Sequence, residues 1–427
     1  MAVQFALLIV PLTITVFGAM DVSRASGEKM RLQDALDAAT LAAARSTATT
    51  DAGVQAVGEA VLAANLAASQ ATLTSSSFVI VDSKVVATAR GAMPTVVANL
   101  WMAGDMTIGA ESEVTRASNN IEVALTLDVT GSMGGQKITD LKAAARDLVD
   151  LVVQDQQSPY YTKLAIVPYS AAVNVGASAA SVRGPYTGGT CTTPGCASYK
   201  FTNAQGNSKT FAISNCVTER TGPDAYTDAA PASGWLGRNY PASGNPCLAS
   251  AIMPLSTDRA ALKSKIDGLS AAGSTAGHLG LAWGWYMVSP NFASLWPTDS
   301  QPAAYGTDKL LKVVVLMTDG AFNTTYCKGV ISQDSGSGSG SSADHINCNA
   351  PNGNAFSQAR ALCDNMKAQG VIIYTVGFDV AADQAAQAIM TECATDAQHV
   401  YLPSTGAALK DAFHAIGQDI SRLRLSR

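Results

Sequence analysis

Charged residues are scarce in this sequence. Only 14% of its 427 residues are Asp, Glu, Lys or Arg, whereas a typical soluble domain has about 25%. The net charge is −5, and the Lys and Arg residues form no cluster. A nucleic-acid-binding surface needs a concentration of basic side chains, so the composition argues against that class of function.

Histidine is rare, with four residues, and every cysteine lies beyond residue 190. A zinc site is the weaker alternative, because the cysteines at the ends of 191–196 have no second pair of matching spacing. Most cysteines fall in segments rich in Gly, Ser, Thr, Asn and Pro. An even number of loop cysteines predicts disulfides and an oxidising compartment. Proximity along the chain favours the pairs Cys327 with Cys348 and Cys363 with Cys393.

The N-terminal segment lacks charge. Residues 2–20 contain no Asp, Glu, Lys or Arg, and a helix of this length can cross the ~30 Å hydrocarbon core of a membrane. We predict that residues 1–21 are a retained transmembrane anchor, because a signal peptide has a shorter apolar part and an Ala-x-Ala site. Basic residues follow the segment and would keep the remainder in the cytoplasm. The predicted disulfides indicate the opposite side, and we give them more weight.

Residues 22–118 have the pattern of a small α+β region. Ala-rich, Pro-free sequence predicts one or two helices up to residue 69, with a break near residues 46–53. A β-hairpin over residues 77–89, turning at 82 and 83, a short helix over 93–103 and a strand over 106–117 follow. The outline of a long helix and a small sheet is pilin-like.

From residue 119 the pattern changes to strands alternating with amphipathic helices. This predicts an α/β fold with a doubly wound, mostly parallel sheet covered on both faces, extending to residue 427. Two disulfide-rich insertions are expected, at residues 183–250 and 322–350, and residues 172–175 are a candidate antiparallel edge strand. The expected strands are 121–128, 163–169, 312–317, 371–378 and 400–402, and the expected helices are 137–154, 257–269, 276–287, 355–369, 381–391 and 406–423.

Polar residues adjoin three of the apolar segments. Asp128, Thr130 and Ser132 end the strand at residues 121–128, Asp319 follows the strand at 312–317, and Thr275 precedes an apolar helix. Ligand sites in such sheets lie beyond the carboxyl ends of the strands, so these side chains are expected to converge. Their hard oxygens suit Mg²⁺ or Mn²⁺. Helix capping and turn formation are the alternatives for each residue.

These segments carry a resemblance. DVTGSM, GSTAGHLGLAWG and LMTDG resemble the three loops of a von Willebrand factor type A domain, a Rossmann-like fold with a metal-ion-dependent adhesion site. The resemblance implies that Thr130 and Ser132 bind the metal directly and that Thr275 contributes from the second loop. It also implies that Asp128 and Asp319 act largely through bound water, and that a partner carboxylate completes the coordination.

The N-terminal sequence FALLIVPLTITVFGAMDVSRA and the closing AFHAIGQDISRLRLS resemble Tad/Flp pilus-assembly proteins of the TadG type. The resemblance implies a single-pass protein of the bacterial inner membrane, with its C-terminal domain periplasmic or extracellular. Its partners would be other pilus-assembly components and a protein or surface polymer that presents a carboxylate.

Other functions remain as alternatives. DVTGS also resembles the DKTGT motif of aspartyl-phosphate phosphotransferases, in which Asp128 would be a nucleophile, but Val129 replaces the lysine. A serine hydrolase using Ser132 and His278 lacks the G-x-S-x-G motif. A structural envelope protein with a non-functional metal site is the stronger competitor. The sequence therefore predicts a membrane-anchored adhesion or pilus-assembly protein that is not an enzyme.

Overall fold

The fold is described from a computed structural model of the chain. Apart from the gaps given next, the structure describes the backbone of residues 2–425 and the side chains from residue 18 onward. The residues not described are 1, 47, 49, 68, 82–83, 96–104, 117–118, 156, 159, 184–189, 192–197, 203–207, 221, 240, 242–243, 327–351 and 426–427, together with the side chains of 2–17, 190–191, 199, 201–202, 209, 211 and 424–425.

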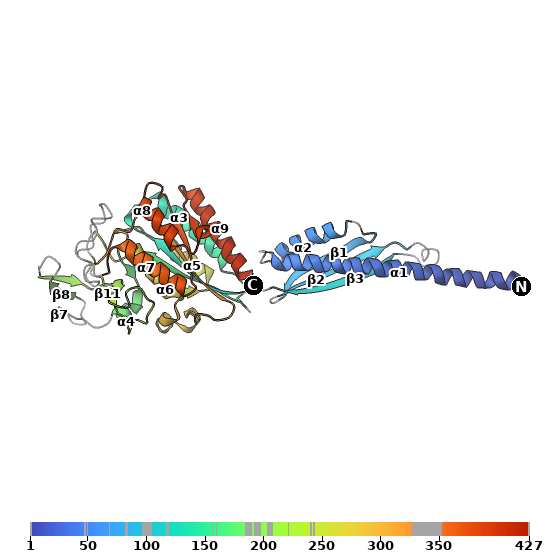
Figure 1. The fold of residues 1–427 in the computed structure, drawn as a ribbon, viewed down its shortest axis with the longest axis horizontal. Helices are drawn as coiled ribbons and strands as arrows, with labels where there is room; N and C mark the ends of the chain where they lie inside the picture. Colours follow the sequence, from blue (N-terminus) through green and yellow to red (C-terminus); the bar gives the residue numbers. More distant parts are fainter. Residues whose placement is uncertain are drawn as a thin grey trace. The chain divides into compact units, whose positions relative to one another are not determined.

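The chain forms two compact units, one of Met1–Ser118 with Leu425–Arg427 and one of Asn119–Arg424. In the first unit, two helices pack on a three-stranded antiparallel sheet of order β1-β2-β3 (Figure 1). Leu36, Phe78 and Val85 lie fully buried between the layers. The elements are α1 (Ala2–Arg45), α2 (Asp51–Asn65), β1 (Thr72–Val81), β2 (Lys84–Met93) and β3 (Met106–Thr115).

The predicted helix break and hairpin are confirmed. Helix α2 begins after Thr50, whose side chain accepts a hydrogen bond from the Gly53 backbone amide and so satisfies a free donor of the first turn. The hairpin turn at residues 82 and 83 lies outside the described residues, as does most of the short helix expected at 93–103. Within the described part of the chain, no helix is both long and apolar enough to cross a membrane. The anchor expected at residues 1–21 stays a prediction.

The second unit is built on a six-stranded sheet of order β12-β5-β4-β13-β14-β15. All neighbouring strands are parallel except β12, which pairs antiparallel with β5. The chain leaves the sheet centre in both directions, so the two central strands β4 and β13 flank the topological switch point. The strands are β4 (Asn120–Asp128), β5 (Thr162–Tyr169), β12 (Met253–Ser256), β13 (Leu310–Thr318), β14 (Ile372–Gly377) and β15 (Val400–Tyr401).

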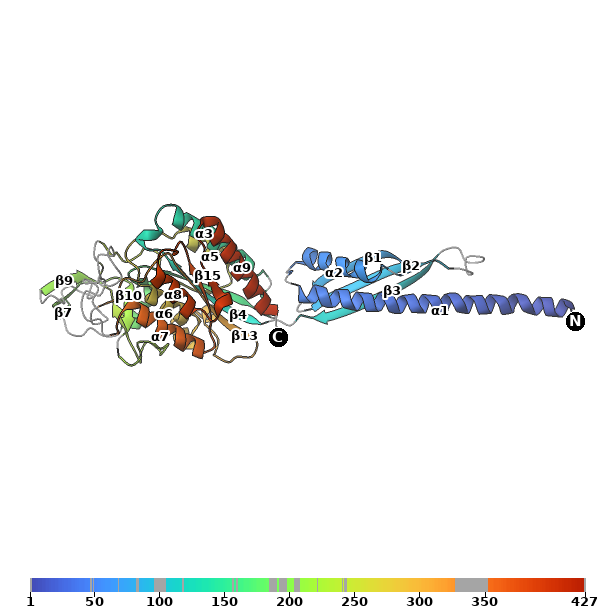
Figure 2. The same cartoon turned by 45° about the horizontal axis from the view of Figure 1, so that its top comes forward.

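Helices cover both faces of this sheet, as the alternating pattern predicted (Figures 1 and 2). Helices α6, α7 and α8 pack over one face with the core around Val314 and Trp283. Helices α3, α5 and α9 pack over the other with the core around Leu125 and Phe413. The bounds are α3 (Gln136–Val152), α5 (Arg259–Asp267), α6 (Gly277–Val288), α7 (Ala355–Ala368), α8 (Gln384–Cys393) and α9 (Gly406–Leu425), with short 3-10 turns η2 (Gly131–Met133), η3 (Gly176–Ser178), η5 (Pro290–Leu295), η6 (Thr298–Ser300) and η9 (Ala397–His399).

Helix α6 is buried along its whole length. Its glycines allow this close approach, because a Cβ at Gly280 would lie 2.3 Å from the Tyr169 ring and one at Gly284 would lie 2.5 Å from Thr126 Oγ1. Both distances are shorter than any real Cβ contact, so larger residues would push the helix off the sheet. The helix therefore holds Tyr169, at the carboxyl end of β5, in a fixed position.

The expected edge strand at residues 172–175 is wrong in its partner. Residues 173 and 174 form β6 (Val173–Asn174), which pairs with strand β10 of the insertion and not with the main sheet. The antiparallel edge is instead β12, which sequence patterning missed because four residues are too few to show a period. The insertion supplies α4 (Ala179–Arg183), β7 (Thr190–Cys191), β8 (Ser198–Thr202), β9 (Ser208–Ala212), β10 (Cys216–Arg220) and β11 (Leu236–Arg238).

Two disulfides lie in the described part of the second unit. Cys363 of α7 bonds Cys393 of α8, as proximity along the chain predicted. Cys216 of β10 bonds Cys247 and closes the insertion. The predicted pair of Cys327 and Cys348 lies outside the described residues. The pairing of these four cysteines supports disulfides over a zinc site.

Candidate functional site

Asp128 is the buried carboxylate of the candidate site. It ends the central strand β4, and its side chain is fully enclosed. The backbone amide of Thr130 donates to Asp128 Oδ1 (2.9 Å), and Thr318 Oγ1 at the end of β13 donates to Oδ2 (2.8 Å). Two neighbouring strand ends therefore hold one carboxylate in a fixed orientation.

The hydroxyl group of a buried tyrosine contacts this carboxylate. The Tyr169 hydroxyl lies 3.3 Å from Asp128 Oδ2 and 3.0 Å from the carbonyl oxygen of Met317. Burial, with the nearby Asp128 charge, raises the pKa of Tyr169 well above its usual value, so the hydroxyl stays a neutral donor. Tyr169 belongs to none of the sequence motifs. Its position at the end of a predicted strand was the one available signal.

The hydroxyl groups of the first loop form a chain that ends on the second carboxylate. Thr130 Oγ1 lies 2.9 Å from Ser132 Oγ, and Ser132 Oγ donates to Asp319 Oδ1 at 2.7 Å. Asp319 follows β13, one residue beyond Thr318. Four of the five residues selected from the sequence are thus connected through direct hydrogen bonds.

Thr275 joins this group through the backbone. Its amide donates to Asn323 Oδ1 (2.8 Å), and its carbonyl oxygen accepts from the Asn323 amide (2.8 Å). The Gly131 amide donates to the carbonyl of Gly273 at 2.8 Å, which ties the second loop to the first. Thr275 is 5% exposed. The three loops are therefore assembled at the carboxyl edge of the sheet, as the strand order requires.

Two asparagines outside the sequence motifs hold the second loop. Asn323 binds Thr275, and Asn245 Oδ1 accepts from both the amide (2.8 Å) and the hydroxyl (2.7 Å) of Ser274. Asn245 lies in the insertion, where the sequence has little periodicity. No local signal marked either residue, because their role depends on contacts with a distant loop.

The electrostatics of the site favour a cation. Burial and, second, the neighbouring Asp319 charge raise the pKa of Asp128 to about 6. Hydrogen bonds from Thr130 and Thr318 oppose this rise. A bound divalent ion would offset both the burial and the repulsion between the carboxylates.

The ligand types also fit such an ion. The five residues offer carboxylate and hydroxyl oxygens only, which suit Mg²⁺ or Mn²⁺ better than a soft metal. No group of three or more His, Cys, Asp or Glu side chains that could hold a metal occurs among the described residues. Hydroxyl groups would therefore have to complete any coordination here.

A lysine outside the sequence motifs contacts the site. Lys137 Nζ lies 3.1 Å from Asp319 Oδ2 and 3.3 Å from Asp379 Oδ2. Partial burial lowers the pKa of Lys137, but the two carboxylates more than compensate, so the net shift is upward. The ammonium group is therefore charged wherever both carboxylates are ionised.

His278 and Ser132 have different partners. His278 Nε2 lies 3.3 Å from Glu219 Oε2 in the buried core. Ser132 donates to Asp319. The residues considered for hydrolysis thus make separate contacts.

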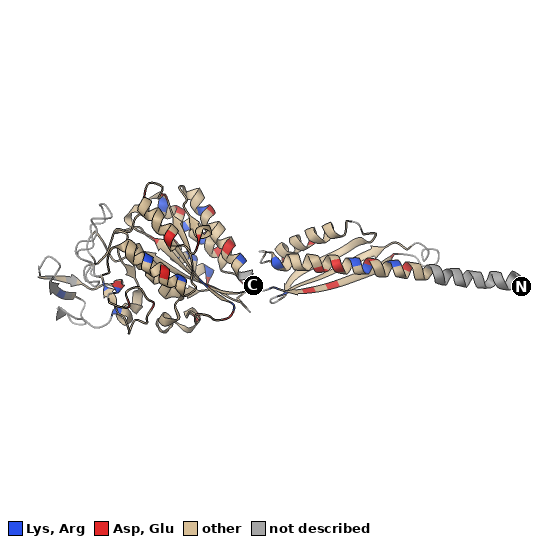
Figure 3. Cartoon of the chain, in the orientation of Figure 1, with Lys and Arg blue, Asp and Glu red and all other residues tan. Residues whose placement is uncertain are grey.

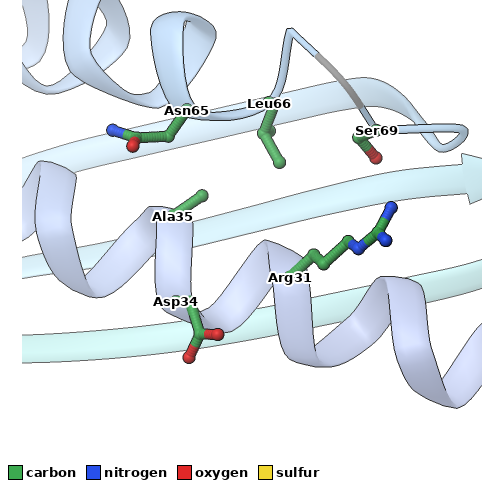
Figure 4. A pocket seen from close by; sticks show the side chains of 6 residues that line it. All are labelled: Arg31, Asp34, Ala35, Asn65, Leu66 and Ser69. Carbon is green, nitrogen blue, oxygen red and sulfur yellow. The ribbon is translucent and has the colours of Figure 1, made fainter.

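The first unit has a surface hollow of about 440 Å³ between its helices (Figure 4). Two of its polar side chains are paired through Glu28, which accepts from Arg31 (3.1 Å) and from Ser69 Oγ (2.7 Å). We assign no ligand to this hollow, which is lined by Arg31, Asp34, Ala35, Asn65, Leu66 and Ser69.

Several solved structures are similar to this chain. One is the vWF domain of the type V pili tip protein Mfa5 from Porphyromonas gingivalis, with 14% identity, a TM-score of 0.41 and coverage of 73% of this chain and 97% of that chain. The pilus adhesin SpaC from Lactobacillus rhamnosus GG has 10% identity and a TM-score of 0.38, and the match covers 82% of this chain and 34% of that chain. The von Willebrand factor type A protein from Catenulispora acidiphila has 15% identity and a TM-score of 0.35, with coverage of 83% and 51%.

No curated protein matches the sequence. Residues 1–46 match the Tad family model, described as "Putative Flp pilus-assembly TadE/G-like". The matched segment includes FALLIVPLTITVFGAMDVSRA, the N-terminal sequence that resembles pilus-assembly proteins. The N-terminal segment of this protein is therefore TadE/G-like, as its sequence indicated.

Proposed function

We propose that this protein acts in pilus assembly or surface adhesion and binds a partner carboxylate through a divalent metal ion. The observation that carries the proposal is the hydrogen-bonded assembly of Asp128, Thr130, Ser132 and Asp319 at the carboxyl edge of the sheet, with Thr275 tied to it. The TadE/G-like N terminus supports the pilus context.

Each residue has a defined part in this proposal. Thr130, Ser132 and Thr275 would hold Mg²⁺ or Mn²⁺ directly, and Asp128 and Asp319 would act through bound water. The metal would supply an electrophilic position for the partner carboxylate. Tyr169 and Thr318 keep Asp128 oriented.

The same geometry favours binding over catalysis. Asp128 is fully buried, and both of its oxygens accept hydrogen bonds. A nucleophilic carboxylate needs access to its substrate. We therefore propose that the protein is not an enzyme and that Asp128 holds the neighbouring site residues in position.

Calorimetry on the purified full-length chain tests the metal site. We expect Mg²⁺ and Mn²⁺ to bind the wild type and Asp128→Ala to abolish binding, while Asp299→Ala, at an exposed position of η6, leaves it unchanged. A peptide with a single aspartate should bind the wild type with Mg²⁺ and be released by EDTA. Equal metal binding by the wild type and Asp128→Ala would refute the site.

The location is part of the proposal. We propose a single-pass inner-membrane protein whose second unit is periplasmic or extracellular, because that unit contains two disulfides in its described part. Acidic and basic residues are mixed along the described helices (Figure 3). Protease added to intact spheroplasts should cleave the second unit. Full protection, with cleavage only after lysis, would place the unit in the cytoplasm.

One alternative has a specific observation in its favour. A structural envelope protein with a non-functional metal site would explain why Lys137 contacts Asp319, since an ammonium group already neutralises part of the site. The titration distinguishes the two functions, because the alternative requires that no divalent ion binds.

A further inference from the structure

Lys137 occupies an unfavourable position for a lysine. It is the second residue of α3, in a first turn that contains no acidic residue. The N-terminal end of a helix carries a partial positive charge, which repels cations. Lys137 is therefore stabilised by groups outside its helix.

Those groups are the carboxylates of Asp319 and Asp379. The Lys137 ammonium nitrogen lies between them, 3.1 Å from Asp319 Oδ2 and 3.3 Å from Asp379 Oδ2. It also lies 5.7 Å from the centre of the Phe378 ring. The side chain is 31% exposed, so it can move without repacking the core.

Asp379 is held in a conformation that non-glycine residues seldom adopt. Its φ is 57°, in the left-handed region. The Asp379 amide donates to Pro403 O (2.8 Å), and the preceding Phe378 amide donates to Thr318 O (2.8 Å). These bonds fix Asp379 beside the end of β13, while its carboxylate stays 53% exposed.

The two acceptors of Lys137 differ in their relation to the site. Asp319 also accepts from Ser132 and belongs to the proposed metal site, whereas Asp379 bonds none of its five residues among the described contacts. A divalent ion near Asp319 would repel the ammonium group at short range. Asp379 offers Lys137 a second carboxylate within reach.

We propose that Lys137 is a tethered cation that competes with the divalent metal for Asp319 and transfers to Asp379 when the metal binds. The lysine thereby weakens metal binding, so that the site fills only at high metal concentration or when a partner carboxylate adds a further ligand. This inference rests on the proposed metal-dependent function. It assigns Lys137 and Asp379 as residues that set metal affinity without binding the ion.

Calorimetric titration of the full-length chain with Mg²⁺ and Mn²⁺ tests the competition. We expect Lys137→Met to lower the metal dissociation constant about tenfold, a coupling of the size found for charged groups in contact. Lys142→Met removes the same charge from the same helix. Its ammonium group contacts the Asp267 carbonyl instead, so we expect little change.

The gain in metal affinity of Lys137→Met should also persist at about 0.5 M salt, because salt screens charges in direct contact less than charges far apart. An unchanged or weaker affinity in Lys137→Met would overturn the inference, and so would an equal gain in Lys142→Met.

A double-mutant cycle tests the transfer to Asp379. We expect Asp379→Asn to weaken metal binding in the wild type, because Lys137 then has Asp319 as its one acidic acceptor. The same substitution should have little effect in the Lys137→Met background. Equal weakening in both backgrounds would mean that Asp379 acts on the metal directly and would overturn the transfer.

The outcomes separate this inference from the function on which it rests. Metal binding by the wild type with no gain in Lys137→Met overturns the competition alone. Binding by Lys137→Met and not by the wild type supports the competition and overturns the metal-dependent function of the wild type. No binding by either protein overturns both the competition and the metal-dependent function.

Discussion

Replacing Asp128 by Asn should stabilise the protein without metal and remove its response to metal. Asp128 is fully buried, and its pKa rises from 3.8 to about 6 because of burial and the Asp319 charge. A raised acid pKa means that folding favours the protonated form. The ionised carboxylate at neutral pH therefore costs the fold about 3 kcal/mol, from roughly two pKa units.

The sign of the pH dependence follows from this shift. Below its ordinary pKa, Asp128 is protonated in both the folded and the unfolded state and is not penalised. As the pH rises from about 4 to about 6, the unfolded chain loses the proton more readily, so the free energy of unfolding falls. In Asp128→Asn this contribution is absent. The hydroxyls of Thr318 and Tyr169 can rotate to accept from the new amide.

Urea unfolding in EDTA, followed by tryptophan fluorescence, measures the effect. Between about pH 4.5 and pH 7.5 the wild type should lose about 2 kcal/mol more stability than Asp128→Asn. At pH 7.5, Mg²⁺ should raise the stability of the wild type and leave that of Asp128→Asn unchanged. Asp299→Asn removes a charge at an exposed position and should follow the wild type. Parallel pH profiles for the wild type and Asp128→Asn, or a less stable Asp128→Asn at pH 7.5, would refute the reasoning.

Three further experiments test the fold of the second unit. Lys312→Met would leave Glu122, its buried ion-pair partner on the neighbouring strand, unpaired and should cost about 3–5 kcal/mol of unfolding free energy; a double variant with Glu122→Gln should recover part of this loss. Replacing Cys363 and Cys393 together by Ala should lower the unfolding free energy by about 2–4 kcal/mol and reduce, without abolishing, the effect of dithiothreitol on the melting temperature, because the Cys216–Cys247 bond remains. Gly280→Ala should cost about 1–3 kcal/mol through overpacking and weaken metal binding, because its Cβ would displace the tyrosine ring below the site; an unchanged metal affinity would mean that this ring does not position the site.

Local patterns were sufficient to predict the alternating elements of the second unit. Strand β4 and helix α3 were expected within two residues of their observed ends, because a buried strand and an amphipathic helix differ in period. Helix α8 begins at Gln384 instead of residue 381, since the Asp383 side chain caps it by accepting from the Ala386 amide. A capping residue fixes the first residue of a helix more closely than the spacing of the apolar residues does.

Strand partners could not be predicted in the same way. The residues of β6 and β12 were too few to show a period, and each pairs with a segment distant in the sequence. Pairing depends on which other strand edges remain open, and that is a property of the whole sheet. The sequence therefore predicted an antiparallel edge but assigned it to the wrong residues.

The sequence by itself determined the candidate ligands. Asp128, Thr130, Ser132, Thr275 and Asp319 are recognisable because each follows a strand or precedes a helix, and parallel strands bring such ends to one edge. Only the tertiary structure decided what surrounds them. Lys137, Tyr169, Asn323 and Asn245 reach the site through contacts between segments far apart in the chain. Their distances and burial arise when the sheet and its loops assemble, so no local pattern could reveal them.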